Sequence, residues 1–284
     1  MKTTKMQRRA FLTAIGAATI SAVLPRAALA SSGADYDNLL ILIELNGGND
    51  GLNTVIPYAS GDYHALRPRL AIPRDQVLQL DEKSGLHPSL QPVLPLWEAK
   101  ELAIIQGVGY PQPNLSHFRS IEIWDTASHS TEYLADGWLA RTFAHAPAPK
   151  SYAADGVVIG TAALGPMAGQ GARAIALTNT EQFLRQARLA APSGATRSGA
   201  LNHILKVESN IVQAAGNMTG DYAFRTEFPR TPFGNAIRTA SHVVAAKAGV
   251  AAIKVSLNGF DTHSGQQVTQ ARLLRELAEG LVAL

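Results

Sequence analysis

The sequence predicts an α/β protein with a doubly wound, largely parallel β-sheet. Three apolar runs, at residues 38–45, 102–108 and 250–257, are nearly continuous, which is typical of strands covered on both faces. Gly or Asn residues follow each run and are expected to end the strand. Helical patterns lie between the runs, and strands that alternate with helices form a parallel sheet with helices on both faces.

The remaining elements are weaker strands and helices, each predicted from its own pattern. Two shorter strands are expected at residues 156–160 and 173–177. Helices are expected at residues 88–100, 117–127, 138–145, 180–189, 200–217 and 235–248. The region 128–217 is the least strand-like part of the chain and is a candidate cap-like insertion.

The first 30 residues have the three parts of an export leader. Arg8 and Arg9 lie in a basic stretch, an apolar stretch extends to Leu24, and Ala28 and Ala30 are the small residues of a cleavage site. Paired arginines are typical of twin-arginine export, so we expect the twin-arginine translocase as a partner, cleavage after Ala30, and a periplasmic or secreted mature protein. An uncleaved anchor is the alternative, but the apolar stretch is shorter than the roughly 20 residues of a membrane span, so no stable span is expected.

The basic charge of the whole chain comes from this leader. The formal net charge is +3 for 284 residues, but residues 1–30 contain five Lys and Arg and no acid. The mature chain of 254 residues carries 20 Lys and Arg against 22 Asp and Glu, a formal charge of −2, so no nucleic-acid partner is expected. The chain has no cysteine, which excludes disulfides and thiolate metal sites.

Polar clusters follow the three strongest predicted strands. Residues 46–51 follow the first strand, residues 114–117 the second, and residues 261–263 the third. In an open parallel sheet, the carboxyl ends of the strands border the crevice in which ligands bind. We therefore expect the three loops to meet at one edge of the sheet and to share a site.

In the first cluster, Asn49 and Asp50 follow two glycines. The glycines permit a sharp turn close to a ligand, and Asp50 supplies an oxygen donor of the kind that hard cations prefer. Alternatively, Asp50 caps the helix that follows, and for this cluster alone capping is the favoured interpretation.

In the second cluster, Asn114, Ser116 and His117 precede a predicted helix. A serine at a helix N-terminus either caps the helix or acts as a nucleophile, because the helix dipole also stabilises an alkoxide. Capping is the commoner role. His117 is a candidate for orienting a phosphate-like group or binding a metal, and the alternative is a structural histidine. No lysine or carboxylate base is close in sequence, so a metal is the expected activator of Ser116.

In the third cluster, Asp261 and His263 are two residues apart in a loop between Gly259 and Gly265. Residues two apart in an extended segment point to the same side, which suits joint binding of a divalent ion. One Asp-x-His is weak by itself, and hydrogen-bonded loop residues are the alternative.

Taken together, these stretches resemble the DUF1501 family of exported bacterial proteins. The resemblance covers nearly the whole mature chain. The stretches that carry it are LILIELNGGNDGLNTVIPY (40–58), YHALRPRLAI (63–72), GLHPSLQPVLPLW (85–97), LAIIQGVGYPQPNLSHFRSIEIWDTA (102–127), GWLAR (137–141) and GFDTHSGQ (259–266). The family has no assigned function, so the resemblance by itself implies none.

The DUF1501 family is in turn similar to the alkaline phosphatase and sulfatase superfamily. That similarity implies an alkaline-phosphatase-like fold and metal-assisted attack on a phosphate or sulfate ester. It places Asp50 at the first carboxylate ligand, Ser116 near the nucleophile, and Asp261 with His263 at a metal pair. Family members of usual length continue to a Gly-Thr-Asp-His-Gly motif, so we expect the C-terminal part of the domain at 31–284 to be missing here.

Two functions of different classes follow from these expectations. The first is a metal-dependent hydrolase of a small phosphate or sulfate ester, with Zn, Mn, Mg or Ca as the divalent ion. Because the twin-arginine route carries folded proteins, such an ion could be loaded before export. The alternative is a binding or assembly protein of the cell envelope whose site is degenerate, or a truncated chain without activity.

Overall fold

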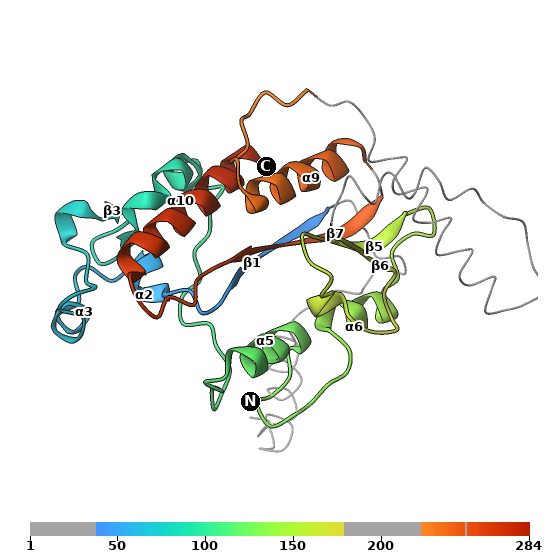
Figure 1. The fold of residues 1–284 in the computed structure, drawn as a ribbon, viewed down its shortest axis with the longest axis horizontal. Helices are drawn as coiled ribbons and strands as arrows, with labels where there is room; N and C mark the ends of the chain where they lie inside the picture. Colours follow the sequence, from blue (N-terminus) through green and yellow to red (C-terminus); the bar gives the residue numbers. More distant parts are fainter. Residues whose placement is uncertain (1–37, 179–222, 248) are drawn as a thin grey trace, which may run out of the picture. The chain divides into compact units, whose positions relative to one another are not determined.

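A four-stranded parallel β-sheet forms the centre of the computed structural model (Figure 1), which describes residues 38–178, 223–247 and 249–284. The strands are β1 (Leu40–Asn46), β5 (Ala154–Ile159), β6 (Ala174–Leu177) and β7 (Val250–Asn258), in the spatial order β1-β7-β5-β6. Leu40 pairs with Ala252 and Asn46 with Asn258, so β1 and β7 end together. The strand ends that carry two of the polar clusters are therefore neighbours.

Strand β7 is the buried centre of this sheet. Every residue from Val250 to Val255 is buried, as is all of β5, whereas β1 at the edge of the four strands is partly exposed along its length. Neighbouring β7 residues belong to different apolar clusters, with Ile253 in one and Ala252 in the other. This alternation of faces is the geometry of a strand that is covered on both sides.

Helices pack on both faces of the sheet (Figure 1). One face is covered by α9 (Pro232–Ala245) and α10 (Gln266–Ala283), whose buried apolar side chains pack with those of β5 and β7. The 3₁₀ helix η2 (Pro88–Val93) packs on α10. The other face carries α5 (His117–Thr126), α6 (Trp138–His145) and η3 (Gly165–Met167). The sheet with helices on both faces confirms the predicted α/β class.

A small antiparallel sheet lies beside the loop that follows β1. Its strands are β2 (Val55–Ile56), β3 (Leu78–Gln79) and β4 (Gly85–Leu86), in the order β2-β4-β3. Short helices α2 (Gly51–Thr54), α3 (Gly61–Leu66), η1 (Arg74–Gln76) and α4 (Leu94–Glu98) complete this region. Its own apolar cluster consists of Ile56, Tyr58, Tyr63 and Val77. Across the described ranges, no helix has the length and apolarity needed to cross a membrane.

The prediction of a strand at residues 102–108 is wrong. This segment joins neither sheet, and although Leu102 and Ile104 pack partly against the core, Ile105 is 81% exposed. An apolar run satisfies the burial requirement of a strand, but a strand also needs a neighbour for its N–H and C=O groups. No such backbone pairing forms for this run among the described residues.

The other predicted elements differ mainly at their ends. The strands predicted at 156–160 and 173–177 are β5 and β6, and the helices at 117–127 and 138–145 are α5 and α6. The helix predicted at 88–100 is divided into η2 and α4, because Pro92 and Pro95 lack the N–H groups that a continuous helix requires. The helix predicted at 235–248 begins earlier, at Pro232, where Thr231 caps it.

Part of the predicted helical region lies outside the described residues. The helices predicted at 180–189 and 200–217 fall there. Within the candidate cap-like insertion, 128–217, strands β5 and β6 belong to the central sheet. The boundaries of that insertion stay a prediction.

Candidate functional site

The carboxyl ends of β1 and β7 bring two of the predicted loops into contact. The side-chain amide of Asn46 donates to Asn258 Oδ1 (3.0 Å), and the Phe260 amide donates to the Asn46 carbonyl (3.1 Å). Gly47 has a φ of +104°, and a Cβ at this position would lie 2.6 Å from the amide nitrogen of Asp261. Only glycine permits both this backbone conformation and this approach. The loop after β1 therefore packs directly on Asp261.

The remaining loop, residues 114–117, reaches the same place through His117, the first residue of α5. Its Nε2 lies 3.3 Å from Asp261 Oδ1, and the Nε2 of His263 lies 3.0 Å from the same oxygen. A Cβ at Gly48 would lie 3.3 Å from the His117 ring. Although residues 102–108 form no strand, the loop that follows them still reaches the edge of the sheet.

Asp261 is the centre of this group. Its carboxylate is placed to hold the proton-bearing Nε2 of both imidazoles, an arrangement that leaves each Nδ1 with a lone pair. Such a nitrogen is able to accept a proton or to bind a metal. His117 and Asp261 are about half exposed and His263 is 86% exposed, so a ligand has access from solvent.

Each histidine, paired with Asp261, has the spacing of two ligands of one metal ion, but the three side chains together do not form a site. Ligands about 2.1 Å from one ion are about 3.0–3.4 Å from each other, which is the spacing of each Nε2 from Asp261 Oδ1. An ion bound between these two atoms requires the tautomer with the proton on Nδ1. In the described part of the chain, however, no group of three or more His, Cys, Asp or Glu side chains is arranged to hold a metal ion. As they stand, these residues do not form a closed metal site.

Asp50 bonds to residues other than the two histidines. Its carboxylate accepts hydrogen bonds from both terminal nitrogens of Arg67, from the side chain of Gln266 and from the amide of Asn53. Asp50 is also the N-cap residue of α2. The capping alternative for Asp50 is thus observed, and its carboxylate ties the β1 loop to the start of α10.

Asn49 belongs to the same connection. Its side-chain amide donates to Thr54 Oγ1 (2.9 Å), and its Oδ1 accepts from Gln270 of α10 (3.4 Å). Gln270 also donates to the backbone carbonyl of Asp50 (3.0 Å). Asn49 and Asp50 therefore position the loop, whereas Gly47 and Gly48 make its contacts with Asp261 and His117.

Ser116 and Asn114 lie on an exposed turn before α5. The Ser116 amide donates to Asn114 Oδ1 (2.9 Å), and the Asn114 amide donates to the Tyr110 hydroxyl (3.1 Å). Ser116 occupies the N-cap position, but its hydroxyl accepts no capping hydrogen bond. Asn114 thus shapes the turn, and the Ser116 hydroxyl is not used by the helix.

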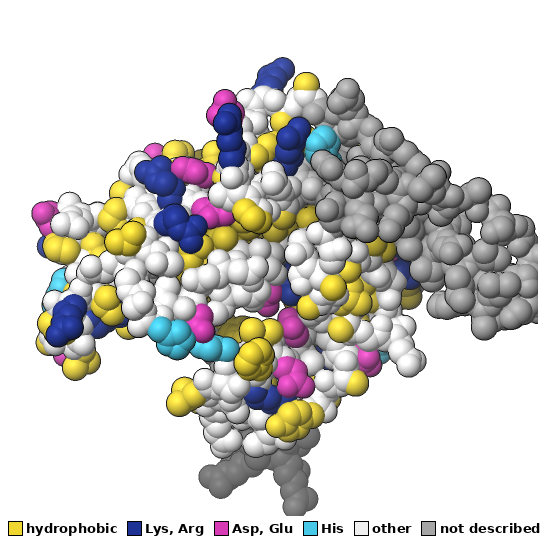
Figure 2. All heavy atoms as spheres, viewed as in Figure 1, with side chains coloured by type: hydrophobic (Ala, Val, Ile, Leu, Met, Phe, Trp, Pro, Cys, Tyr) yellow, Lys and Arg dark blue, Asp and Glu magenta, His cyan; other side chains and the backbone are white. Residues whose placement is uncertain are grey.

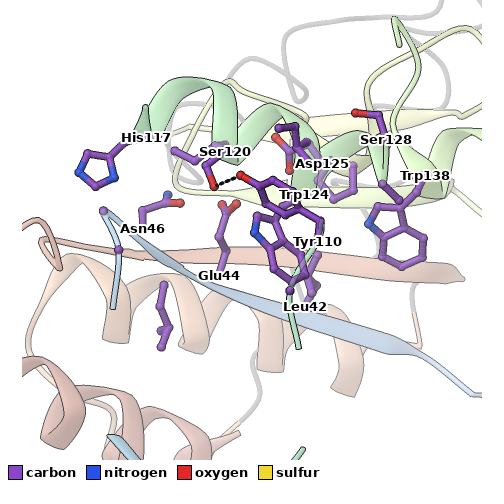
Figure 3. Close-up of a pocket in the computed structure, with 18 residues that line it drawn as sticks. Leu42, Glu44, Asn46, Tyr110, His117, Ser120, Trp124, Asp125, Ser128 and Trp138 are labelled. Carbon is purple, nitrogen blue, oxygen red and sulfur yellow. Dashed lines mark hydrogen bonds between the residues drawn. The ribbon is translucent and has the colours of Figure 1, made fainter. Parts of the chain in front are cut away.

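A cleft of about 850 Å³ lies between β1 and α5 beside this group (Figure 3). Its polar side chains include His117, Glu44, Asp125 and Ser120. The Tyr110 hydroxyl donates a hydrogen bond to Ser120 Oγ (3.1 Å). Three aromatic residues, Tyr110, Trp124 and Trp138, also line it. Clefts of this size with a few polar groups are typical of small-molecule sites.

Two partly buried carboxylates, Glu44 and Asp125, line the cleft, and the buried Lys254 lies behind them; the sequence prediction missed this charged floor. Lys254 of β7 is 4% exposed and lies 2.9 Å from Glu44 of β1, which also accepts a hydrogen bond from Ser256 (3.1 Å). A Cβ at Gly165 would meet both Lys254 Nζ (2.5 Å) and Asp125 Oδ1 (3.0 Å). The signal for this cluster is in the sequence, because Glu44 and Lys254 interrupt otherwise apolar strand patterns.

Burial strongly affects Asp125. Removal from water raises the pKa of its carboxyl to about 6, against the opposing effect of Lys254 and with a further contribution from Glu44. A perturbed carboxyl group in a cleft is typical of functional sites, although structural ion-pair networks also produce such shifts.

A comparison with models of protein families shows which family the chain belongs to. The model of DUF1501, described as a protein of unknown function, matches residues 37–284. The chain belongs to the DUF1501 family. No curated protein and no solved structure matches it. Every residue of the histidine group and of the cleft lies within the region that matches the DUF1501 model.

Proposed function

We propose that this DUF1501 protein is a hydrolase of small phosphate or sulfate esters and that its site is the group of His117, Asp261 and His263. The observation that carries the proposal is the meeting of three loops, distant in sequence, on one carboxylate beside a cleft. The arrangement at the carboxyl ends of parallel strands is that of ligand sites in open α/β sheets. We further propose that the complete fold is alkaline-phosphatase-like, as the family resemblance implies.

The chemistry assigned to the residues is proton transfer. His117 takes a proton from the attacking hydroxyl of water or of Ser116, and Asp261 stabilises the imidazolium that forms. As the nucleophile bonds to phosphorus or sulfur, the bond to the alcohol oxygen breaks. That oxygen takes a proton from His263 when this ring is an imidazolium, and the ring becomes neutral in the step. If Ser116 is the nucleophile, a water molecule then hydrolyses the seryl ester, with His117 again taking the proton.

A divalent ion, Zn, Mn, Mg or Ca, remains part of the proposal as an added component. When bound, such an ion would polarise the ester and lower the pKa of the nucleophile. His117, Asp261 and His263 offer it two pairs of donors with a shared carboxylate. Further donors would have to come from solvent, from the substrate, or from outside the described residues.

The test is hydrolysis of aryl phosphates and aryl sulfates by the purified protein, with each of the four ions and with a chelator. We expect His117→Ala and Asp261→Asn to lower kcat by about 10²–10⁴-fold, the contribution typical of general acid–base groups. His129→Ala, at an exposed position outside the cleft, is the matched control and should keep full activity. Turnover no higher than that of a Ser116→Ala, Asp261→Ala double variant would refute the proposal.

A second candidate function is a binding or assembly protein of the cell envelope. Exposed hydrophobic side chains favour it, and Figure 2 shows such side chains gathered over α5 and the loop before it. They include Ile105, Val108, Leu115, Phe118 and Trp124. Large exposed apolar patches are typical of interaction surfaces.

Metal addition separates the two candidates. A bound ion at 100 times its Kd would stabilise the folded protein by about 2.7 kcal/mol, which corresponds to a Tm increase of roughly 5–10 °C. The hydrolase proposal expects this increase and its loss in Asp261→Asn. An unchanged Tm with all four ions, together with no turnover, would favour the binding protein.

Export through the twin-arginine route is proposed from the leader alone. The Arg8→Lys, Arg9→Lys double variant is expected to stay in the cytoplasm, and the translocase would then be the partner of residues 1–30. Cell fractionation with immunodetection measures this. Equal amounts of both forms in the periplasm or medium would show that another route exports the protein.

A further inference from the structure

The cleft between β1 and α5 has a charged floor that the proposed hydrolysis does not use. Glu44 extends from β1 and Asp125 from α5, so the two carboxylates approach the cleft from opposite elements (Figure 3). Burial is the main cause of the raised pKa of Asp125, and the charge of Glu44 raises it further, as expected for two carboxylates that lie near each other. The buried Lys254 is the cation between them.

The floor carries a surplus of negative charge at neutral pH. Lys254 forms an ion pair with Glu44, whereas none of the hydrogen bonds and ion pairs found among the described residues involves the Asp125 carboxylate. With the pKa of Asp125 near 6, this carboxyl is mostly ionised at pH 7. Two carboxylates then face one ammonium group, and the unbalanced charge favours a positively charged ligand.

Aromatic side chains form the walls above this floor. Tyr110 and Trp124 meet edge to face with their ring centroids 6.3 Å apart. Trp138 lines the cleft at the end opposite His117 (Figure 3). Trp124 is 51% exposed, so one part of its ring is open to a ligand. Aromatic faces attract organic cations through their electron density and bury the alkyl groups that surround the charge.

From this lining we infer that the cleft binds an organic ammonium group, such as that of an amino alcohol or a quaternary ammonium alcohol. The carboxylates of Glu44 and Asp125 attract the charge, and Trp124, Trp138 and Tyr110 contact its alkyl groups. A free anion is repelled by the same carboxylates. The ammonium group would belong to the alcohol part of the ester that the protein hydrolyses, so the inference rests on the proposed function.

Direct binding to the purified protein tests this ligand class. The probe is choline chloride, followed by calorimetry and by the fluorescence of the tryptophans, with glycerol and sodium phosphate as the uncharged and anionic comparisons. We expect choline to bind more tightly than glycerol. Asp125→Asn and Trp124→Leu should each weaken choline binding by about 5–10-fold, since each removes roughly one charge or cation–π contact.

Matched controls guard against loss of fold. Glu101→Gln removes an exposed carboxylate outside the cleft and should leave choline binding unchanged. The Tm of each variant is measured in parallel, and Trp124→Leu, at a half-exposed position, is the substitution least able to disturb the core. A weakened affinity without a decrease in Tm supports the inference.

The outcomes for the cleft and for the histidine group are separate. Absence of choline binding, or equal affinity for glycerol, would overturn the inference even if the protein hydrolyses aryl phosphates. Choline binding that depends on Asp125 and Trp124 would support it even if no turnover occurs, and only the hydrolase proposal would then fall.

Discussion

Asp125 is the residue whose chemistry the fold changes most. Its pKa of about 6 in the folded protein, raised from 3.8 mainly by burial, means that the folded state binds this proton more tightly than the unfolded chain does. The contribution of Asp125 to stability is therefore most favourable below pH 4 and decreases as pH rises from about 4 to about 6. Above that window, the protein retains an ionised carboxylate that folding disfavours.

Replacement of Asp125 by Asn removes this penalty. We expect Asp125→Asn to raise the free energy of unfolding at pH 7 by about 1 kcal/mol, well below the full equivalent of the pKa shift because solvent reaches this partly exposed carboxyl, and to change it little at pH 4. Urea denaturation of both proteins at several pH values measures the difference. An effect of equal size at both pH values would show that burial does not perturb this carboxyl.

Gly47 is the residue on which the contact between two site loops depends. Gly47→Ala places a Cβ 2.6 Å from the Asp261 amide at a φ of +104°, so the loops must separate. We expect a loss of roughly 1–3 kcal/mol in stability, the cost typical of a strained backbone position. Gly51→Ala is the control, because a Cβ there meets nothing within 4 Å and its φ is not positive. Equal stability of the two variants would contradict the packing described for Gly47.

At the scale of elements, the connection between α2, α3 and α10 holds the loop after β1. Arg67, the residue that follows α3, donates to both carboxylate oxygens of Asp50. Gln266, in the first turn of α10, donates to one of them. The hydrogen bond to Asp50 is the main reason that the pKa of Arg67 is raised above its usual value. This connection fixes the loop that contacts Asp261.

Removal of the guanidinium should weaken this connection. We expect Arg67→Met to lower the free energy of unfolding by about 1–3 kcal/mol, because Asp50 then loses its charged partner in a half-buried position. Arg69→Met, at an exposed position two residues later, is the control and should change stability by less than about 0.5 kcal/mol. Chemical denaturation at constant pH compares the three proteins, and equal loss in both variants would argue against a specific role of Arg67.

A strand was predicted correctly where its apolar run also has a neighbouring strand to pair with. β1 and β7 combine a continuous apolar pattern with a parallel partner, and both were predicted. Residues 102–108 have the same pattern but no partner strand among the described residues, and pairing is not encoded in a local run. The start of α9 was missed because the signal lies in the Thr231-Pro232 cap and not in apolar periodicity.

The candidate site was predicted in part for a similar reason. The loop of Asp261 and His263 was expected beside the loop after β1, because β1 and β7 are parallel and end together. His117 contacts Asp261 although the strand predicted before its loop does not form. That these residues form a functional site stays a prediction. The partner of Asp50, Arg67, could not be predicted, since it lies on another short helix's boundary and no periodicity links the two. The charged floor was overlooked, although Glu44 and Lys254 in buried strands are an unusual pattern.

At the scale of the molecule, the described residues combine a rigid sheet with two adjacent polar regions. The histidine group lies at the carboxyl ends of β1 and β7, and the cleft with its carboxylates lies between β1 and α5 (Figure 3). One region is suited to proton transfer and the other to holding a positively charged group. From the two regions together, we propose hydrolysis of an ammonium-bearing ester as the function of this DUF1501 protein.

The central claim is that His117 and Asp261 act as one unit, and a double-mutant cycle on aryl phosphate hydrolysis tests it most directly. The measurement is kcat/KM for the wild-type protein, His117→Ala, Asp261→Asn and the double variant. If the two residues share one task, the double variant loses no more activity than the more damaging single variant. Losses that multiply, or single variants with full activity, would contradict the account.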